Sequence, residues 1–203
     1  SHHGLSILNC PPLRFPEFKD EWEETNINSC TCRLTNGFTY DTNCNDGVAI
    51  SRIETIHDKS IDYERVGHYS GDLSKIAPYK METGDILFSH INSLTHMGKT
   101  ALYKGEYDLY HGMNLLLLRV KEGIDYSFFY YLLNTPRIQG RFQVIAKPAV
   151  NQASISTSDL KKETINICTL TEQIKIGRLL SKIDERIATQ NKIIEKLQSL
   201  IRG

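Results

Sequence analysis

The sequence predicts an α/β domain, in which helices pack on a mixed sheet, followed by a long C-terminal helix that forms a coiled coil. Two observations predict the domain: short β-like runs alternate with glycine-marked turns between residues 47 and 120, and two segments with helix-capping residues follow them. The third observation is a heptad pattern of apolar residues near the C-terminus, which needs a second helix to cover it. Its positions are Ile176, Leu180, Ile183, Ile187, Ile194, Leu197 and Ile201, with Gln190 in the single gap.

Length and composition suit this plan. The 203 residues, 40% of them apolar, can form one sizeable domain with an extension. No apolar run approaches the roughly 20 residues that span a bilayer, and five cysteines, an odd number without framework spacing, favour a reducing compartment. We therefore expect a cytoplasmic protein without a membrane segment. The first three residues match a purification-tag remnant as well as a natural terminus, so segment 1–12 is set apart from the fold.

The predicted sheet is built from short runs bounded by glycines. These runs cover residues 47–53, 85–88, 100–104 and 113–120. Farther along the chain we expect a loop at 146–154, a short strand at 154–156 and another strand at 164–168.

Two helices are predicted between the sheet and that loop. Asp125 can cap the first, in which Tyr126, Phe129, Tyr130 and Leu133 share one face. For the second helix, Thr135 supplies the N-cap and Pro136 the first helical residue. We expect both helices to pack on the sheet.

The terminal helix is predicted over Leu170–Arg202, with Thr169 and Glu172 forming a capping box at its start. A helix of this length spans about 50 Å, at ~1.5 Å per residue, which exceeds the expected width of the domain. It must therefore project. The predicted organisation is a domain at 13–168 followed by a spacer and dimerisation helix at 169–203.

Charge and motif content give little sign of catalysis. Lysine and arginine balance aspartate and glutamate at 24 each, which counts against nonspecific binding of nucleic acid through a basic excess. The segment 93–100 lacks the first glycine of a phosphate-binding loop, and segment 9–13 lacks the first proline and the aromatic residue of an amino-methyltransferase loop. Histidines are scattered, and Cys30, Cys32 and Cys44 do not follow zinc-ligand spacing. We expect neither an active site nor a metal site.

Polar side chains are nevertheless concentrated at strand ends and in loops. Residues able to read base edges by hydrogen bonds are common among them, and Arg137, Arg141 and Lys147 fall in an acid-free window. Ordinary turn chemistry is the alternative explanation, and composition alone favours it. The candidates for base contact are Ser89, His90, Asn92, Lys99, Asn151 and Gln152, and those for phosphate contact are Arg137, Arg141 and Lys147.

Several short motifs occur in an order that is similar to a known family. They are Gly-Asp-Ile-Leu-Phe at 84–88, Gly-Lys-Thr-Ala-Leu at 98–102, Asn-Gln-Ala-Ser-Ile-Ser at 151–156 and Asp-Leu-Lys at 159–161, followed by Glu172-Gln173-x-x-Ile176-Gly177 at the entry to the heptads. The opening segment 13–22 fits as well. Over residues 13–203 the chain resembles the DNA-specificity subunits of type I restriction-modification systems.

The resemblance implies a half-subunit, because such subunits usually contain two target-recognition domains, each followed by a long helix. The half is either naturally short or cut from a longer gene. Pairing of two identical chains, or of this chain with a second half-subunit, through the heptad positions would complete it. Loops of each domain would enter the major groove of one half-site, and the coiled coil would fix the gap, giving an interrupted palindrome.

The resemblance also implies that the chain itself is non-catalytic and binds no cofactor. Partner modification subunits would bring S-adenosylmethionine and methylate a flipped base, and a restriction subunit would bring ATP and magnesium. Two other functions remain open from the residues. The chain could be a coiled-coil adaptor whose α/β domain binds a protein or small ligand, or an ATP-dependent enzyme that uses the Lys99 loop.

Overall fold

A computed structural model describes residues 14–41, 44–93, 96–149 and 152–202. The predicted features at 1–12 and 9–13, and Asn151, lie outside these residues. The central element is an antiparallel sheet with the strand order β2-β10-β7-β9. Its strands are β2 (Thr31–Asn36), β10 (Leu116–Val120), β7 (Ile86–Phe88) and β9 (Thr100–Leu102). Parallel pairing in the described part of the chain is limited to isolated bridges, Phe38 with Gly112 and Ile50 with Tyr110.

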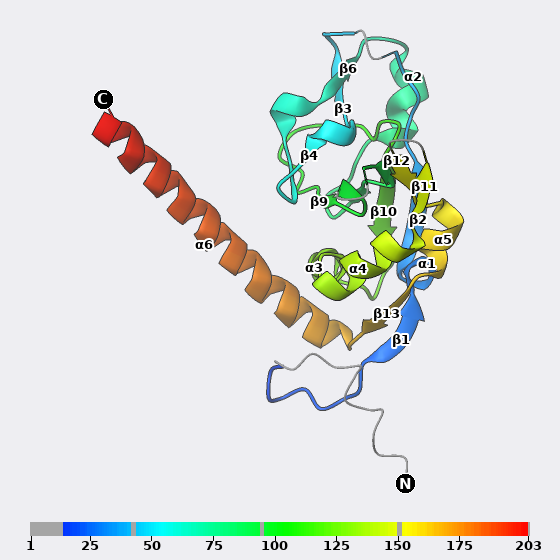
Figure 1. The fold of residues 1–203 in the computed structure, drawn as a ribbon, viewed down its shortest axis with the longest axis vertical. Coiled ribbons are helices and arrows are strands. Elements are labelled where there is room, and N and C mark those ends of the chain that lie inside the picture. Colours follow the sequence, from blue (N-terminus) through cyan, green and yellow to red (C-terminus); the bar gives the residue numbers. More distant parts are fainter. Residues whose placement is uncertain (1–13, 42–43, 94–95, 150–151, 203) are drawn as a thin grey trace.

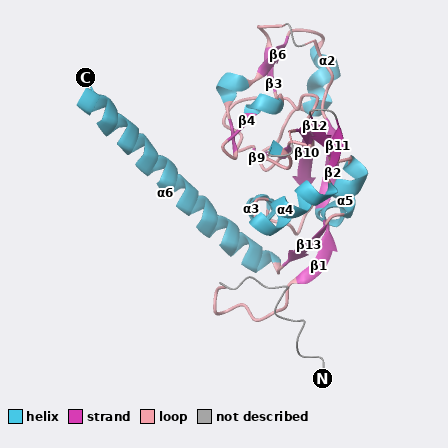
Figure 2. Ribbon diagram, viewed as in Figure 1, coloured by secondary structure: helices cyan, strands magenta, loops and turns pink. Residues whose placement is uncertain are grey.

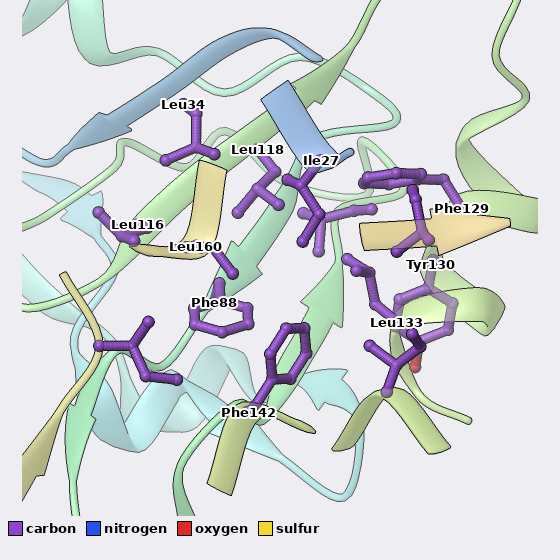
Figure 3. Packing of buried hydrophobic residues seen from close by; sticks show 14 of the residues in the cluster. Ile27, Leu34, Phe88, Leu116, Leu118, Phe129, Tyr130, Leu133, Phe142 and Leu160 are labelled. Carbon is purple, nitrogen blue, oxygen red and sulfur yellow. The ribbon is translucent and has the colours of Figure 1, made fainter. Parts of the chain in front are cut away.

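The central sheet is buried on both faces. Leu116 and Leu118 of β10 face the helices, whereas Leu115 and Leu117 face a second apolar cluster. Side chains alternate between the faces of a strand, so an unbroken apolar run is what a doubly covered strand requires. Figure 3 shows the helix side, where Phe88, Leu116 and Leu118 meet side chains from α3 and α4. Burial of both faces therefore explains the continuous apolar run from which a strand was predicted at 113–120.

Smaller antiparallel sheets of two or three strands lie around this central sheet (Figure 1). They are β1 (Glu23–Asn26) with β13 (Thr164–Ile167), β3 (Val48–Ile50) with β6 (Gly67–Tyr69), β4 (Ile56–His57) with β5 (Ser60–Ile61), and the sheet β11-β12-β8 formed by Lys147–Ala149, Gln152–Ser154 and Ile91–Asn92.

The predicted helix caps are confirmed. Asp125 accepts a hydrogen bond from the Phe128 amide at the start of α3 (Tyr126–Leu133), and Thr135 accepts one from the Ile138 amide at the start of α4 (Pro136–Ile145). Short helices α1 (Ile27–Cys30), α2 (Leu73–Ile76) and α5 (Thr157–Lys162) complete the domain.

Three local predictions are wrong. The segment 146–154 is not a loop, because β11 and β12 form there and pair with β8; β12 ends where the predicted strand at 154–156 begins, and Ser156 instead caps α5. Tyr126 lies on the predicted face of α3 with its ring against Gly84, although it is 39% exposed, and Phe128 is buried against Trp22 because α3 packs on two sides. The capping box fails, since the carboxylate of Glu172 bonds elsewhere.

The terminal helix α6 runs over Leu170–Arg202, as predicted, and Figure 2 shows it as one continuous helix that extends away from the domain. Its first turns pack on α3. The Gln173 side chain accepts a bond from the Asp125 amide and donates to the Cys168 carbonyl, at 3.0 and 2.7 Å. Gly177 lies so close to α3 that a Cβ atom would be 2.6 Å from the Asp125 carboxylate. None of the described helices is both long and apolar enough to cross a membrane.

The N-terminal segment fastens the same turns from the other side. Arg14 donates two hydrogen bonds of 2.6 Å to the carboxylate of Glu172, which is fully buried, and the Trp22 indole lies 3.4 Å from that carboxylate. One turn on, Lys175 pairs with Glu17 and lies 4.3 Å from the centre of the Phe15 ring. The first turns of α6 are therefore packed into the domain.

Candidate nucleic-acid interface

The loop between β8 and β9 is held in place by α4. Gly98 has a φ of +76°, a conformation that side chains disfavour, and a Cβ atom there would be 2.8 Å from the Phe142 ring. The side chain of Gln139 donates to the Gly98 carbonyl at 2.9 Å. Lys99 follows on this fixed backbone with its side chain exposed, and its ammonium lies 3.4 Å from the ring of His96. The loop therefore presents a lysine from a rigid support.

Asn92 shapes the start of this loop. Its side-chain oxygen Oδ1 accepts a hydrogen bond from the Ser93 backbone amide at 2.8 Å, and its side-chain nitrogen Nδ2 donates to the Ser89 hydroxyl at 3.1 Å. Ser89 and His90 themselves are 1% and 8% exposed. Burial lowers the pKa of His90 to about 4, so its ring is neutral at physiological pH. Ser89 and His90 thus lack the surface that contact with a base would need.

Lys147 and Gln152 lie on the paired strands β11 and β12, and β12 pairs with β8, which precedes the loop. Gln152 is therefore carried on the same small sheet as Asn92, and both Gln152 and Lys147 are exposed. The Lys147 ammonium lies 2.9 Å from the carboxylate of Asp159 and holds the pKa of that group below its usual value. Lys147 remains open to solvent, with 72% of its side chain exposed.

The two arginines of α4 differ. Arg137 is exposed in the first turn. Arg141 forms an ion pair with the buried carboxylate of Glu163 and donates to the Thr164 hydroxyl at 2.8 Å. Its guanidinium therefore neutralises a buried acid of the domain, which leaves little of its charge for a phosphate.

No group of three or more histidine, cysteine or acidic residues in the described ranges is placed to hold a metal ion. Cys32 is exposed and Cys30 is buried, so the two do not present thiols together.

Comparison with known proteins identifies the family. The family described as type I restriction modification DNA specificity domain matches residues 19–199. The chain belongs to this family. A putative type I restriction enzyme MjaX specificity subunit from Methanocaldococcus jannaschii is 43% identical over 192 residues, covering 92% of this chain and 45% of the relative. The chain thus spans just under half the length of this curated relative.

Solved structures agree on the fold of this specificity-family chain. A type I restriction-modification S subunit from M. genitalium has a TM-score of 0.61 at 20% identity, over 86% of this chain and 42% of that one. The HsdS subunit from Thermoanaerobacter tengcongensis has a TM-score of 0.58 at 17% identity, over 87% and 41%. The predicted fold class and family are both confirmed.

The heptad positions of α6 fall into two groups: the first are covered by the domain, and the later ones are exposed. Ile176 packs on the cluster of Trp22, Phe128 and Cys168, and Leu180 is half-buried. From there on the helix is exposed, although Tyr131 donates to Asp184 at 2.8 Å and fixes it one turn further. The exposed heptad positions are Ile183, Ile187, Gln190, Ile194, Leu197 and Ile201, which we call the open seam.

The sequence patterns did not single out two residues that lie near Lys99. The β4-β5 hairpin places Lys59 beside the Lys99 loop, and α4 adds Gln143 on an exposed turn. The signal for the hairpin was weak, because its strands are two residues each and Asp58-Lys59 is not one of the usual two-residue turn pairs.

Proposed function

We propose that this chain is one recognition half of a type I specificity subunit, and that it binds one half-site of a bipartite double-stranded DNA target. The match of the specificity family to residues 19–199 carries this proposal. The chain itself catalyses nothing. It acts in the cytoplasm by directing a modification subunit, and a restriction subunit where present, to the sequence that it reads.

The proposed base contacts come from the β8-β9 loop and the β11-β12 strands. Lys99, Gln152 and Asn151 are the proposed readers, and Lys147 and Arg137 are the proposed phosphate contacts. Asn92 positions the loop through its two hydrogen bonds. Ser89, His90 and Arg141 are left out of the proposed contacts, because the first two are buried and the third is paired with Glu163.

The cofactors are proposed to reside on partner subunits. Transfer of a methyl group needs S-adenosylmethionine, and translocation and cleavage need ATP and magnesium. The domain boundary proposed from the sequence lies at 168–169, but the helix up to Asp184 is fastened to the domain, so the free spacer begins after it.

The proposed partner for the open seam is the same segment of a second copy, running antiparallel. In an antiparallel pair each a position of the heptad faces a d position of the other helix. A register centred near residue 192 then covers the whole open seam. Ile183 faces the partner's Ile201, Ile187 faces the partner's Leu197, and Gln190 faces the partner's Ile194. Registers shifted toward the domain would need Ile176 and Leu180, which pack on the domain instead.

The double variant Ile183→Asp with Ile187→Asp tests this pair. Burying charges in the seam opposes association, so we expect monomers by light scattering where the unmodified chain gives twice that mass. The matched control is Ala188→Asp with Thr189→Asp, which places the same charges on exposed positions beside the seam. An unchanged mass for the seam variant, or loss of the dimer in both, would contradict the register.

Methylation profiling tests the function as a whole. Cells carrying this chain and its neighbouring modification subunit are compared with cells lacking only this chain. We expect a gapped palindrome to be methylated in the first cells alone, because two identical halves read identical half-sites. The absence of any chain-dependent motif would refute the proposal and favour an adaptor.

A further inference from the structure

The β4-β5 hairpin ends in a turn that is fastened to the core. Its two central residues, Asp58 and Lys59, have φ values of 45° and 62°, in the left-handed region that favours glycine. The hydroxyl of Tyr130, a buried residue of α3, donates to the Lys59 carbonyl at 2.6 Å. A long-range bond of this kind keeps the tip in one position, although the side chains of both tip residues are exposed.

A cavity of about 390 Å³ lies where the tip, the β8-β9 loop and the helices α3 and α4 meet. Pockets for small molecules are usually lined by apolar and aromatic side chains. This one, which we call the tip cavity, is lined mainly by charged and amide side chains. They are Asp58, Lys59, Lys99, Asn134, Gln139 and Gln143.

Two of the amides are committed to the fold. The Asn134 nitrogen donates to the Thr100 hydroxyl and the Tyr130 carbonyl, at 2.6 and 2.8 Å. The Gln139 nitrogen donates to the carbonyls of Gly98 and Leu133. These bonds hold the floor of the tip cavity rigid. Gln143, in contrast, is exposed and forms no hydrogen bond with its side chain inside the described part of the chain, so its amide has both a donor and an acceptor to offer.

The mixture of charges favours base edges over phosphates. A carboxylate at Asp58 opposes a phosphate, whereas it accepts a hydrogen bond from the amino group of cytosine. Lysine donates to the O6 and N7 atoms of guanine, and glutamine forms paired bonds with the N6 and N7 atoms of adenine. The major groove also admits a two-stranded β-ribbon, which is the shape of the β4-β5 hairpin.

We propose that the tip cavity is a base-reading site, with Lys59 and Gln143 as specificity-determining residues that contact base edges in the major groove. This inference rests on the proposed function and adds a second reading element to the β8-β9 loop. The rigid floor and the Tyr130 bond keep the backbone that carries Lys59 and Gln143 in a fixed relation, which discrimination between bases requires.

The test uses the full chain assembled with its modification subunit and a pool of double-stranded DNA with random sequence. The sequences retained are compared for the unmodified chain, Lys59→Ala, Gln143→Ala and Gln143→Glu. We expect each alanine variant to lose preference at one position of each half-site by about tenfold to a hundredfold. Gln143→Glu should exchange an adenine preference for cytosine, because glutamate only accepts hydrogen bonds. Lys75→Ala, an exposed lysine on α2, is the control and should change nothing.

The outcomes separate the two proposals. If the unmodified chain retains no preferred sequence, the proposed function fails and this inference fails with it. If the unmodified chain is selective and all three cavity variants keep its preference, the inference alone is refuted. Uniform weakening with an unchanged preference would also overturn it, since that is the behaviour of a phosphate contact.

Discussion

The contact between α6 and α3 depends on the missing side chain of Gly177. A Cβ atom there would be 2.6 Å from the Asp125 Oδ1 atom, 3.0 Å from the Phe128 backbone nitrogen and 3.1 Å from the Ser127 Cβ atom. The same Oδ1 atom accepts the bond of 2.8 Å from the Phe128 amide that caps α3. A methyl group at 177 must therefore displace the cap of α3 or move α6.

The free energies work against each other in Gly177→Ala. Alanine is favoured over glycine inside a helix by about 1 kcal/mol. Loss of an N-cap costs about 1 kcal/mol, and crowding a packed contact costs about 1–3 kcal/mol. We therefore expect the free energy of unfolding to fall by about 1–3 kcal/mol. For a chain of this size, each kcal/mol lowers the melting temperature by about 2–4 °C.

Gly140→Ala is the matched control, measured by urea unfolding beside Gly177→Ala. Gly140 also lies inside a helix, α4, but a Cβ atom there would meet nothing within 4 Å. Only the difference in helix propensity then contributes, and we expect the free energy of unfolding to rise by about 1 kcal/mol. The two variants make the same chemical change, but we expect them to change the free energy of unfolding in opposite directions. If Gly177→Ala stabilises the chain as much as Gly140→Ala, the contact does not hold α6 in place.

Other predictions concern the buried charges, pH and DNA. Arg14→Ala leaves the Glu172 carboxylate buried without its cation, so we expect a loss of about 3 kcal/mol in urea unfolding, partly recovered by adding Glu172→Gln. Burial lowers the pKa values of His90 and His111 to about 4, below the unfolded value. The unfolded chain therefore binds more protons between pH 6.5 and 4, and stability falls over this range as pH falls. His111→Gln should reduce the slope of the free energy of unfolding against pH in this range. No dependence on pH in the unmodified chain would contradict the burial of these histidines. Lys147→Ala should weaken binding to all DNA sequences alike and reduce the salt slope by about one, whereas an altered target preference would show that this residue reads bases.

The sequence predicted best those elements whose signal is local. The capping residues Asp125 and Thr135 mark their helices because a cap is a bond to an amide three residues away. The strand β2, in contrast, was missed although it pairs with β10 in the central sheet, since Leu34 is its one buried residue. β11 was missed because Lys, Pro and Ala at 147–149 have low strand propensity, and the pairing partners of this strand are set by tertiary contacts.

The exposure of the candidate site residues was predictable in part. Lys99 and Gln152 lie at the surface, as expected of polar residues in a loop or at a strand end. The burial of Ser89 and His90 could not be seen, since it comes from loops that pack over the end of β7. The tip cavity combines residues from positions 58 to 143, and no local pattern brings such residues together.

The heptad periodicity shows that α6 has a stripe of apolar side chains, but it cannot show which element covers each part of that stripe. The domain covers Ile176 and half of Leu180, which leaves the open seam exposed. In the proposed antiparallel pair, with its centre near residue 192, the two Leu180 positions lie about 36 Å apart at ~1.5 Å per residue. One turn of B-DNA is about 34–36 Å, or 10–10.5 base pairs. Leu180 is the last heptad position that the domain partly covers, so on the proposed register the partly covered ends of the two seams are about one turn of DNA apart. We expect the methylated palindrome to have half-site centres about one turn apart, and a clearly different spacing in the methylation profile would refute the register.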